Sequence, residues 1–528
     1  MQSRSTQINT KTKSLLWLFD MAQPLQNITI SAPGFAGLNT QDAPLTQEPS
    51  FAAIANNCVI DKSGRIASRK GYTMVSTNGP AVLGSSAGIE SIGEFIETDG
   101  TKVVFSAGNN KIFSGTSTLT DITASLTITA NNWAMCPLAN KFYLFQRGHL
   151  PLVYDAATSA LTTIVAHSGA VGTPPSAHIA ITAFGRIWAA DVTGNKQTLY
   201  WSDQLDGVDW STGSSGSLDL TTVFPGGFDE IVALMAHNNF LIILGKRSIL
   251  IYSGAGTPST MTLSDTILNI GCVSRDAVQS TGKDVLFLDY SGVRSLSRTI
   301  RAESSPIGDI SKNVNNDIKT RVQAETGNIK TVYDANNAFY LVNFPTIGVL
   351  YCFDTRFPLG DGSYRTTTWT SIDPLCFVVT DTDALYLGVA TGIGEYTSNT
   401  DDSSAYPLQY FSHPLGFGDS SRLKFLKKVN VTTFNGADAT VVLNWSYDYE
   451  QDYQKQAYTL TGSDAAQYNI SEYNTTAEYS KSLTLINTQK VNTTGSGSVI
   501  TVGITSDVNG SEIAFQELNI HSLIGRIN

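Results

Sequence analysis

The sequence predicts an all-β protein: a β-propeller of six to seven blades, a C-terminal antiparallel β-sandwich-like platform domain and an extended N-terminal arm. The first observation behind this fold class is a repeated unit of two short apolar runs around a Gly-containing turn, the pattern of a β-hairpin. The second is the spacing of the copies, about 40 to 50 residues, which is the period of four-stranded propeller blades. The third is the composition. Only 15% of the residues are charged, and Gly (44), Ser, Thr and Asn are abundant, as on β surfaces and in turns.

The repeated unit is clearest at residues 241–252 (LIILGKRSILIY), where two apolar runs flank a turn at 245–248. Further copies are expected at residues 103–113, 142–154, 285–296, 339–353 and 385–396, with a longer copy at 184–202. A single hairpin cannot bury its apolar face alone, so we expect the copies to stack. Unrelated hairpins in a sandwich are the alternative, which the regular spacing disfavours.

The N-terminal residues 1–20 are expected to be a flexible leader. Their apolar run, 14–19, is shorter than the roughly 7 to 15 residues of a secretory signal core, and no A-x-A-like site follows it. Met21 is therefore a candidate natural start. No stretch of the sequence approaches the ~20 apolar residues of a membrane span.

Three larger parts follow the leader. Residues 21–85 are rich in Pro and Gly at first and are expected to form an extended arm that contributes to the platform. Residues 86–400 contain the repeats and are assigned to the propeller, for which residues near 73–85 are a candidate closing strand. Residues 401–528 are assigned to a separate platform domain.

One segment of the propeller region has a helical rather than a β pattern. Ile310, Val314, Ile318 and Val322 recur every four residues, and Asp309 is a suitable N-cap, which predicts a helix over 309–322. We expect this helix to cover one face of the ring. Five tryptophans of the same region are expected to pack between blades: Trp133, Trp188, Trp201, Trp210 and Trp369.

In the platform region, Asn-Gly pairs predict two hairpins. Asn435-Gly436 lies between apolar-alternating segments at 429–434 and 439–445. Asn509-Gly510 lies between segments at 499–505 and 512–520. Asn-Gly is the strongest short-range hairpin signal, because both residues accept positive φ.

Charge and cysteine usage exclude several functional classes. The formal net charge is −11 and like charges form no block, which disfavours a surface that grips phosphates. A negative lining would instead let DNA slide past. The cysteines are odd in number, widely spaced and without a CxxC pair, so we expect reduced, mostly buried thiols and no zinc site: Cys58, Cys136, Cys272, Cys352 and Cys376.

No catalytic, cofactor-binding or metal-ligating residue is predicted. The G-x-S-x-G match at 84–88 lacks the strand-to-helix context of a nucleophile elbow. The acid groups fall in turns or alternating strands and are expected to be solvated: Asp206/Asp209, Asp381/Asp383, Asp401/Asp402 and Asp448/Glu450/Asp452. The last group lacks the spaced loop of an EF-hand. The histidines are scattered, with no HxH or HExxH, and there is no P-loop or strand-linked GxGxxG: His149, His167, His178, His237, His413 and His521.

The order of motifs along the chain carries a family resemblance. In the arm it rests on Ala-Pro-Gly-Phe at 32–35, Ala55-Asn56-Asn57, Gly64-Arg65-Ile66 and Arg69-Lys70-Gly71-Tyr72. In the repeats it rests on Arg186-Ile187-Trp188, residues 199–202, Trp210, residues 242–249 and 285–294, Phe344-Pro345, residues 349–354 and Trp369. In this order the sequence resembles the tail nozzle (tail tube or hub) proteins of short-tailed bacteriophages, from about residue 30 to the C-terminus. The leader has no counterpart in that pattern.

The resemblance implies a structural virion protein of the viral tail, assembled in the bacterial host cytoplasm. Such nozzles form hexamers, attach below the head-tail adaptor ring of the portal and extend the channel for DNA ejection. The implied partners are other copies of the chain in a hexameric ring, the adaptor protein and the tail fibres or needle. Genomic DNA would pass through the lumen without specific binding, and no enzymatic activity or cofactor is implied.

Two other classes remain alternatives. The first is a propeller-type glycosidase or depolymerase that acts on host surface polysaccharide, which carbohydrate cleavage would distinguish. The second is a propeller receptor-binding module without a conduit role, for which a monomer or trimer is expected rather than a six-fold ring.

Overall fold

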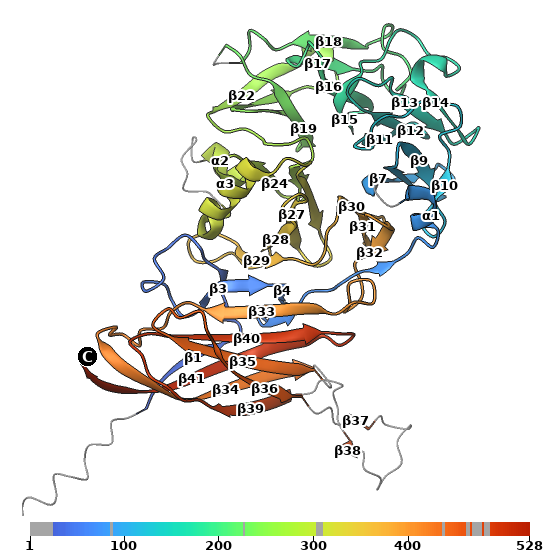
Figure 1. The fold of residues 1–528 in the computed structure, drawn as a ribbon. Helices are drawn as coiled ribbons and strands as arrows, with labels where there is room; N and C mark the ends of the chain where they lie inside the picture. Colours follow the sequence, from blue (N-terminus) through green and yellow to red (C-terminus); the bar gives the residue numbers. More distant parts are fainter. Residues whose placement is uncertain are drawn as a thin grey trace, which may run out of the picture.

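A computed structural model describes residues 25–84, 88–224, 227–301, 310–435, 439–460, 465–466, 478–479 and 486–527. The prediction of an all-β chain is confirmed, because strands form most of the regular structure in these ranges. The α-helices of the described residues are short: α1 (Gly79–Leu83), α2 (Leu296–Arg301) and α3 (Asn315–Ala324). Figure 1 shows small sheets around a common centre, above a layered part that holds both the N-terminal strands and the C-terminal strands.

Seven small antiparallel sheets follow one another along the described chain. The first to third contain β7 (Ile89–Ile96), β8 (Lys102–Gly108), β9 (Lys111–Ser114) and β10 (Thr120–Asp121); β11 (Ala134–Leu138), β12 (Lys141–Phe145), β13 (Leu152–Asp155) and β14 (Ala160–Thr163); and β15 (Ala177–Ala183), β16 (Arg186–Val192), β17 (Thr198–Trp201) and β18 (Gly216–Asp219). The fourth and fifth contain β19 (Ile231–His237), β20 (Phe240–Gly245), β21 (Ser248–Ser253) and β22 (Thr262–Leu268); and β23 (Val278–Ser280), β24 (Val285–Asp289) and β25 (Gly292–Ser295). The sixth and seventh contain β26 (Lys330–Asp334), β27 (Phe339–Phe344), β28 (Val349–Asp354) and β29 (Arg365–Trp369); and β30 (Cys376–Val379), β31 (Leu385–Val389), β32 (Gly392–Glu395) and β6 (Thr73–Met74).

The first strands of these seven sheets meet in a closed circle, and we call the seven sheets together the ring. Each contacts the next in the order β7, β11, β15, β19, β23, β26 and β30, and β30 contacts β7 again. The seventh sheet is completed from the arm, because Met74 pairs with Gly394 and Thr73 with Glu395. The closing strand expected near residues 73–85 therefore lies at the start of that segment.

Each repeat seen in the sequence forms the second and third strands of its sheet. The copy at 241–252 is the hairpin of β20 and β21, with Ile242 opposite Ile251. Both strands are buried almost throughout, whereas the outer strand β22 is mostly exposed. The middle hairpin of each sheet is its most apolar part because neighbouring sheets cover both of its faces, and this explains why it dominates the sequence pattern.

Apolar clusters fill the spaces between neighbouring sheets. Trp188 and Trp201 pack together between the third and fourth sheets, with ring centroids 5.5 Å apart. Phe105 and Phe142 stack at 4.9 Å between the first and second. The expectation that large rings pack between sheets is confirmed for these tryptophans and for the buried Trp133 and Trp369. Trp210 is only partly buried, with its ring centroid 6.0 Å from that of Phe145 in the second sheet.

The helical segment departs from its prediction in extent and in position. A 3-10 turn at Lys312–Val314 precedes α3, which begins at Asn315, and Asp309 lies outside the described residues. Ile318 is buried, as the stripe predicted. However, α2 and α3 pack against β25, where the other sheets have a fourth strand. The apolar stripe thus covers the edge of a three-stranded sheet rather than a face of the ring.

The remaining strands form two stacked sheets, which we call the two-layer domain. One has the order β39 (Ile486–Asn492), β34 (Arg422–Asn435), β41 (Ile513–Ile527), β5 (Ile66–Ser68) and β4 (Cys58–Ile60), and β1 (Gln26–Ser31) also pairs with β41. The other continues the sixth sheet of the ring from β29 through β2 (Gly37–Leu38), β3 (Phe51–Asn56), β33 (Tyr406–Ser412), β40 (Ile500–Val508) and β35 (Thr440–Tyr447) to β36 (Gln454–Thr459), giving ten strands. The short strands β37 (Ala465–Ala466) and β38 (Glu478–Tyr479) pair with each other.

Both Asn-Gly hairpin predictions are wrong. β34 pairs with β39 and β41, whereas β35 pairs with β36 and β40, so the chain changes sheet after Asn435. It changes sheet again around Asn509-Gly510, between β40 and β41. Asn435 has a φ of 57° and Gly510 a φ of 81°, so left-handed backbone serves the reversal, but it does not determine which strand the next one joins.

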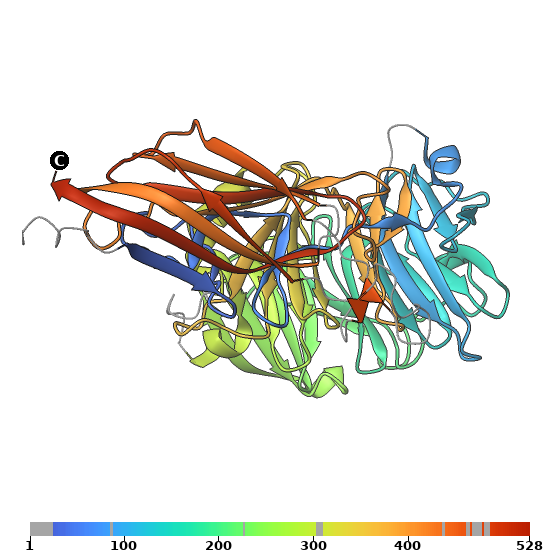
Figure 2. The ribbon, with the colours of Figure 1, turned by 90° about the horizontal axis from the view of Figure 1, so that it is seen from below.

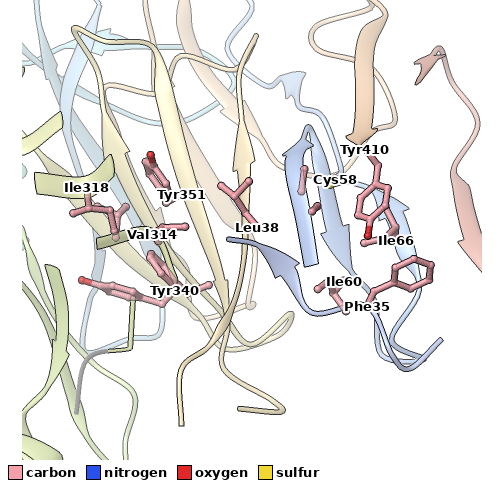
Figure 3. Packing of buried hydrophobic residues seen from close by; sticks show 14 of the residues in the cluster. Phe35, Leu38, Cys58, Ile60, Ile66, Val314, Ile318, Tyr340, Tyr351 and Tyr410 are labelled. Carbon is pink, nitrogen blue, oxygen red and sulfur yellow. The ribbon is translucent and has the colours of Figure 1, made fainter. Parts of the chain in front are cut away.

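The expectation of a separate C-terminal domain also needs correction. Strand β1 lies along β41 with six residue pairs, and Figure 2 shows this N-terminal strand in blue beside the dark red C-terminal one. The core is shared as well: Figure 3 shows it running from Ile318 of α3 past Tyr351 to Cys58 of the arm and Tyr410 of β33. The ring and the two-layer domain therefore share one ten-stranded sheet and one apolar core.

Candidate functional site

Most acids noted in the sequence stabilise local turns or make surface ion pairs. Asp209 Oδ1 accepts the backbone N–H groups of Ser211 and Thr212. Asp448 Oδ1 accepts that of Ser498 at 2.6 Å. Asp381 pairs with Lys102 at 2.6 Å, and both are well exposed. Among the described residues no group of three or more His, Cys, Asp or Glu is arranged to hold a metal, and the serine of the G-x-S-x-G match lies outside them.

Asp209, which is 7% exposed, and Asp401 are buried rather than solvated, so the prediction is wrong for both. Asp401 also forms a buried ion pair. It is 7% exposed and faces Arg69, which is 0% exposed. The guanidinium binds both carboxylate oxygens, Nη1 to Oδ1 at 2.8 Å and Nη2 to Oδ2 at 2.6 Å. It also lies 4.0 Å from the centre of the Tyr406 ring, and the Tyr406 hydroxyl donates to the carbonyl of Arg69. This is the bidentate, stacked geometry that only arginine supplies.

The other Arg69 donors connect three parts of the chain, and we call this site the junction. Nε donates to Asn57 Oδ1 at 3.0 Å, in the arm. Nη2 donates to the carbonyl of Thr370, just after the sixth ring sheet, at 3.1 Å. Trp369 donates its indole N–H to the carbonyl of Cys58 and stacks on Tyr396 with the ring planes 10° apart. Arm, ring and two-layer domain are thus held by one buried, hydrogen-bonded cluster.

Gly71 shows how closely the chain segments approach each other beside the junction. A Cβ at this position would lie 2.0 Å from the carbonyl oxygen of Thr400. Any side chain here would push the arm away from the segment that holds Asp401. The Arg69-Lys70-Gly71-Tyr72 motif therefore owes its glycine to this contact.

At the centre of the ring lies an axial pocket of about 390 Å³. Its lining includes residues of all seven first strands, among them Ile92, Met135, Ile179, Met235 and Phe377. Side chains thus converge on the axis from every sheet.

An ionic cluster forms part of the lining of this pocket, with Arg275 and Lys330 buried and the Asp276 side chain 28% exposed. Arg275 donates from Nε to Asp276 Oδ1 at 3.0 Å and from Nη2 to Asp276 Oδ2 at 2.9 Å. Its Nη1 donates to the carbonyl of His178 at 2.8 Å. Lys330 donates to Asp276 Oδ2 and to Asn132 Oδ1, each at 2.6 Å. Burial acts to raise the pKa of Asp276, but the charges of Arg275 and Lys330 outweigh it and hold that pKa well below its ordinary value. The cluster thereby joins the second, third, fifth and sixth sheets.

His178 is neutral in this environment. Burial, followed by the positive charges of Arg275 and Arg147, lowers its pKa from 6.5 to about 3. Its Nδ1 lies 3.2 Å from Gln146 Oε1. The imidazole therefore serves as a polar, uncharged partner near neutral pH.

Next to this cluster, on one face of the ring, is a second pocket of about 410 Å³, which we call the cleft. Its polar rim alternates in charge: Arg147 pairs with Asp191, and Glu230 pairs with both Lys196 at 3.2 Å and Lys246 at 2.7 Å. Arg147, Lys196 and Lys246 come from the hairpin turns of the second, third and fourth sheets. Asp191 lies near the end of β16, and Glu230 lies just before β19. Tyr290, from the turn of the fifth sheet, is 50% exposed at the same cleft.

Asp191 is the unusual residue of the cleft. It is 6% exposed, its φ is 61°, and its Oδ1 has no hydrogen-bond partner among the described residues. Burial raises its pKa, against the opposing charge of Arg147. A buried carboxylate that is short of a donor and held in left-handed backbone is costly, and such residues concentrate at functional sites.

Neither the junction nor the cleft was found from the sequence as a site. Asp401 and Arg69 are 332 residues apart, and no short motif links them. The cleft residues come from separate hairpin turns, whose common face follows only from the circular order of the sheets. The one available signal was the recurrence of charged residues at the hairpin turns, as at Lys246-Arg247.

Comparisons with known proteins add little beyond this geometry. No family model and no curated protein matches the chain. Among solved structures, it is similar to PorZ, a bacterial surface component of the type-IX secretion system of Porphyromonas gingivalis, at 13% identity and a TM-score of 0.37, covering 59% of this chain and 37% of that one. It is also similar to the WD40 domain of Neurospora crassa Pan2, at 10% identity and a TM-score of 0.29, covering 65% of this chain and 89% of that one. Both likenesses are too low to bear on function. Among the described residues, no helix has the length and apolar character required to cross a membrane.

Proposed function

We propose that the chain is a seven-bladed β-propeller joined to a platform domain, and that it serves as the structural subunit of a phage tail nozzle. The observation that carries the proposal is the junction. Asn57, the Arg69-to-Tyr72 motif and Trp369, on which the family resemblance partly rests, come together there although they are far apart in sequence. A subunit that must keep its propeller at a fixed angle to its platform needs such a buried connection.

The shared sheet supports the same function. Ten strands run without interruption from β26 in the ring to β36 in the two-layer domain. Bending the ring against that domain would require breaking strand pairs within the sheet, as well as the Arg69–Asp401 pair. The chain is therefore suited to a rigid building block rather than to a hinged enzyme.

In this proposal the DNA path lies between subunits and not through the propeller. Side chains from all seven first strands converge around a pocket of only about 390 Å³ at the propeller axis, and the Arg275 cluster is part of its lining. Six copies would enclose the lumen with their platforms, below the adaptor ring and above the tail fibres or needle. A formal charge of −11 per subunit suits a conduit that does not hold DNA.

The subunit count of the purified protein tests this proposal. Native mass spectrometry, with and without an adaptor ring, is expected to give six copies per particle, and negative-stain class averages should display a six-fold ring with a central hole. A stable monomer or trimer in the presence of the adaptor ring would contradict the proposal. Cleavage of surface polysaccharide by such a monomer would favour the enzyme alternative.

A further inference from the structure

The cleft of the ring has the properties of a ligand site that the nozzle function does not use. It is lined by Arg147, Lys196 and Lys246 as cations, which three carboxylates balance: Asp191, Glu230 and Glu325. Arg275 also lines it and shares the Asp276 carboxylate with Lys330, which is not part of the cleft lining. A charged ligand would meet repulsion from half of the rim, so the balance of charge favours a neutral ligand.

The polar groups of the cleft require a ligand that both donates and accepts hydrogen bonds. Asp191 Oδ1 has no partner in the described part of the chain and can only accept while it is ionised. The Lys196 and Lys246 ammonium groups each have three N–H donors. Among the described residues, both ammonium groups bond to Glu230 alone, which leaves donors for a ligand. A ligand that bonds to both sides must carry donors and acceptors a few ångströms apart, as the neighbouring hydroxyls of a sugar do.

The cleft also offers apolar contact. The Tyr290 side chain is half exposed there and lines the cleft together with Lys246, whose pKa is raised mainly by its hydrogen bond to Glu230. Ile231, Val273 and Ile329 lie in the same lining. An exposed aromatic ring beside apolar side chains suits the C–H face of a pyranose, while a simple ion or a small amide would leave it uncovered.

We propose that this cleft binds a saccharide, whose hydroxyls donate to Asp191 and accept from Lys196 and Lys246 while one sugar face packs on Tyr290. The site is on the propeller face, formed by the hairpin turns of the second to fifth sheets, and its occupation does not depend on the conduit role. Bonding to Asp191 Oδ1, a buried atom, would supply a donor that the described part of the chain does not provide.

Two cleft variants and two matched controls test the proposal. Asp191→Asn keeps the size of the side chain and accepts the left-handed backbone, while it removes the charged acceptor. Asp383→Asn is its control, because Asp383 is an exposed acid at a φ of 58° in the turn before β31. Tyr290→Ala removes the exposed ring, and Tyr449→Ala is its control, at a tyrosine 58% exposed in the two-layer domain.

The probe is an array of oligosaccharides and intact polysaccharides from bacterial surfaces, followed by isothermal titration calorimetry with the saccharide that binds best. We expect binding by the wild type, a loss of affinity of roughly tenfold or more in Asp191→Asn, and a several-fold loss in Tyr290→Ala. Both controls should bind within about twofold of the wild type. Binding of short oligosaccharides would identify the sugar units as the ligand, and binding of intact polymers alone would identify a surface polysaccharide; either supports the proposal.

Three results would overturn it: no saccharide bound across the array, binding that the cleft variants leave unchanged, or tight binding of inorganic phosphate or Ca²⁺ that is lost with Asp191→Asn or Tyr290→Ala. Circular dichroism of each variant establishes that it is folded. Should Asp191→Asn not fold, the surface variant Tyr290→Ala still decides the matter. The six-copy count of the nozzle is measured separately, so failure of either idea is distinguishable from failure of the other.

Discussion

Replacing Asp401 with asparagine should destabilise the protein through the junction. Arg69 is fully buried, and the substitution leaves its charge without a counter-charge while its bonds to Asn57 and Thr370 remain. Breaking a buried ion pair on one side costs about 3–5 kcal/mol. Because those neutral bonds persist, we expect a loss near the lower end, about 3 kcal/mol in the free energy of unfolding. Equilibrium urea unfolding, followed by tryptophan fluorescence and far-UV circular dichroism, measures it.

A neighbouring exposed pair provides the control. Lys70 and Glu512 lie 3.1 Å apart beside the junction, and both side chains are 40% exposed. Glu512→Gln should therefore cost less than about 1 kcal/mol. If Asp401→Asn and Glu512→Gln changed stability by the same small amount, the reasoning that burial makes the junction costly to break would be refuted.

Three further predictions concern other buried groups. Trp369→Ala should lower the free energy of unfolding by about 3–5 kcal/mol and remove the contribution of this indole to the near-UV circular dichroism, because the indole is 1% exposed, stacks on Tyr396 and donates to the carbonyl of Cys58. Unchanged stability would contradict that packing. In the native state His178 has a pKa of about 3, whereas in the unfolded chain its pKa is near 6.5. The free energy of unfolding should therefore fall as the pH drops from 6.5 towards 3. His178→Gln should weaken this pH dependence, which urea titrations at several pH values measure. All five cysteines are buried, and burial raises the pKa values of their thiols, so a thiol reagent should label the native protein at the rate of unfolding; fast labelling at neutral pH would show an accessible thiol.

The hairpins of the ring could be predicted because the two strands of each hairpin are close together in the sequence. Hairpins such as β20–β21 can be recognised in the sequence as two apolar runs separated by a short turn. Because such a hairpin lies between other sheets, it is apolar on both faces. The stripe of Ile310, Val314 and Ile318 likewise revealed a helix, although its first residue was misplaced.

Long-range pairings could not be predicted by the same reasoning. Asn435-Gly436 specifies a turn, but whether β35 then pairs with β34 or crosses to the opposite sheet depends on strands that arrive later in the chain. The insertion of β1, β4 and β5 into sheets made largely of C-terminal strands has the same origin. Asp401 was expected to be solvated because it falls in a turn or an alternating strand, whereas in the structure it is buried against Arg69, 332 residues earlier. The cleft escaped prediction because Asp191, Glu230 and Tyr290 meet only when the sheets close into a circle.

The most direct test of the proposed nozzle is a cryo-electron microscopy reconstruction of the assembled oligomer bound to an adaptor ring. We expect a closed six-fold assembly whose lumen is bordered by the two-layer domains, with the seven small sheets of each subunit placed away from the six-fold axis. A reconstruction without six-fold closure would contradict the proposal. So would one in which the central channel runs through the seven small sheets of a single subunit.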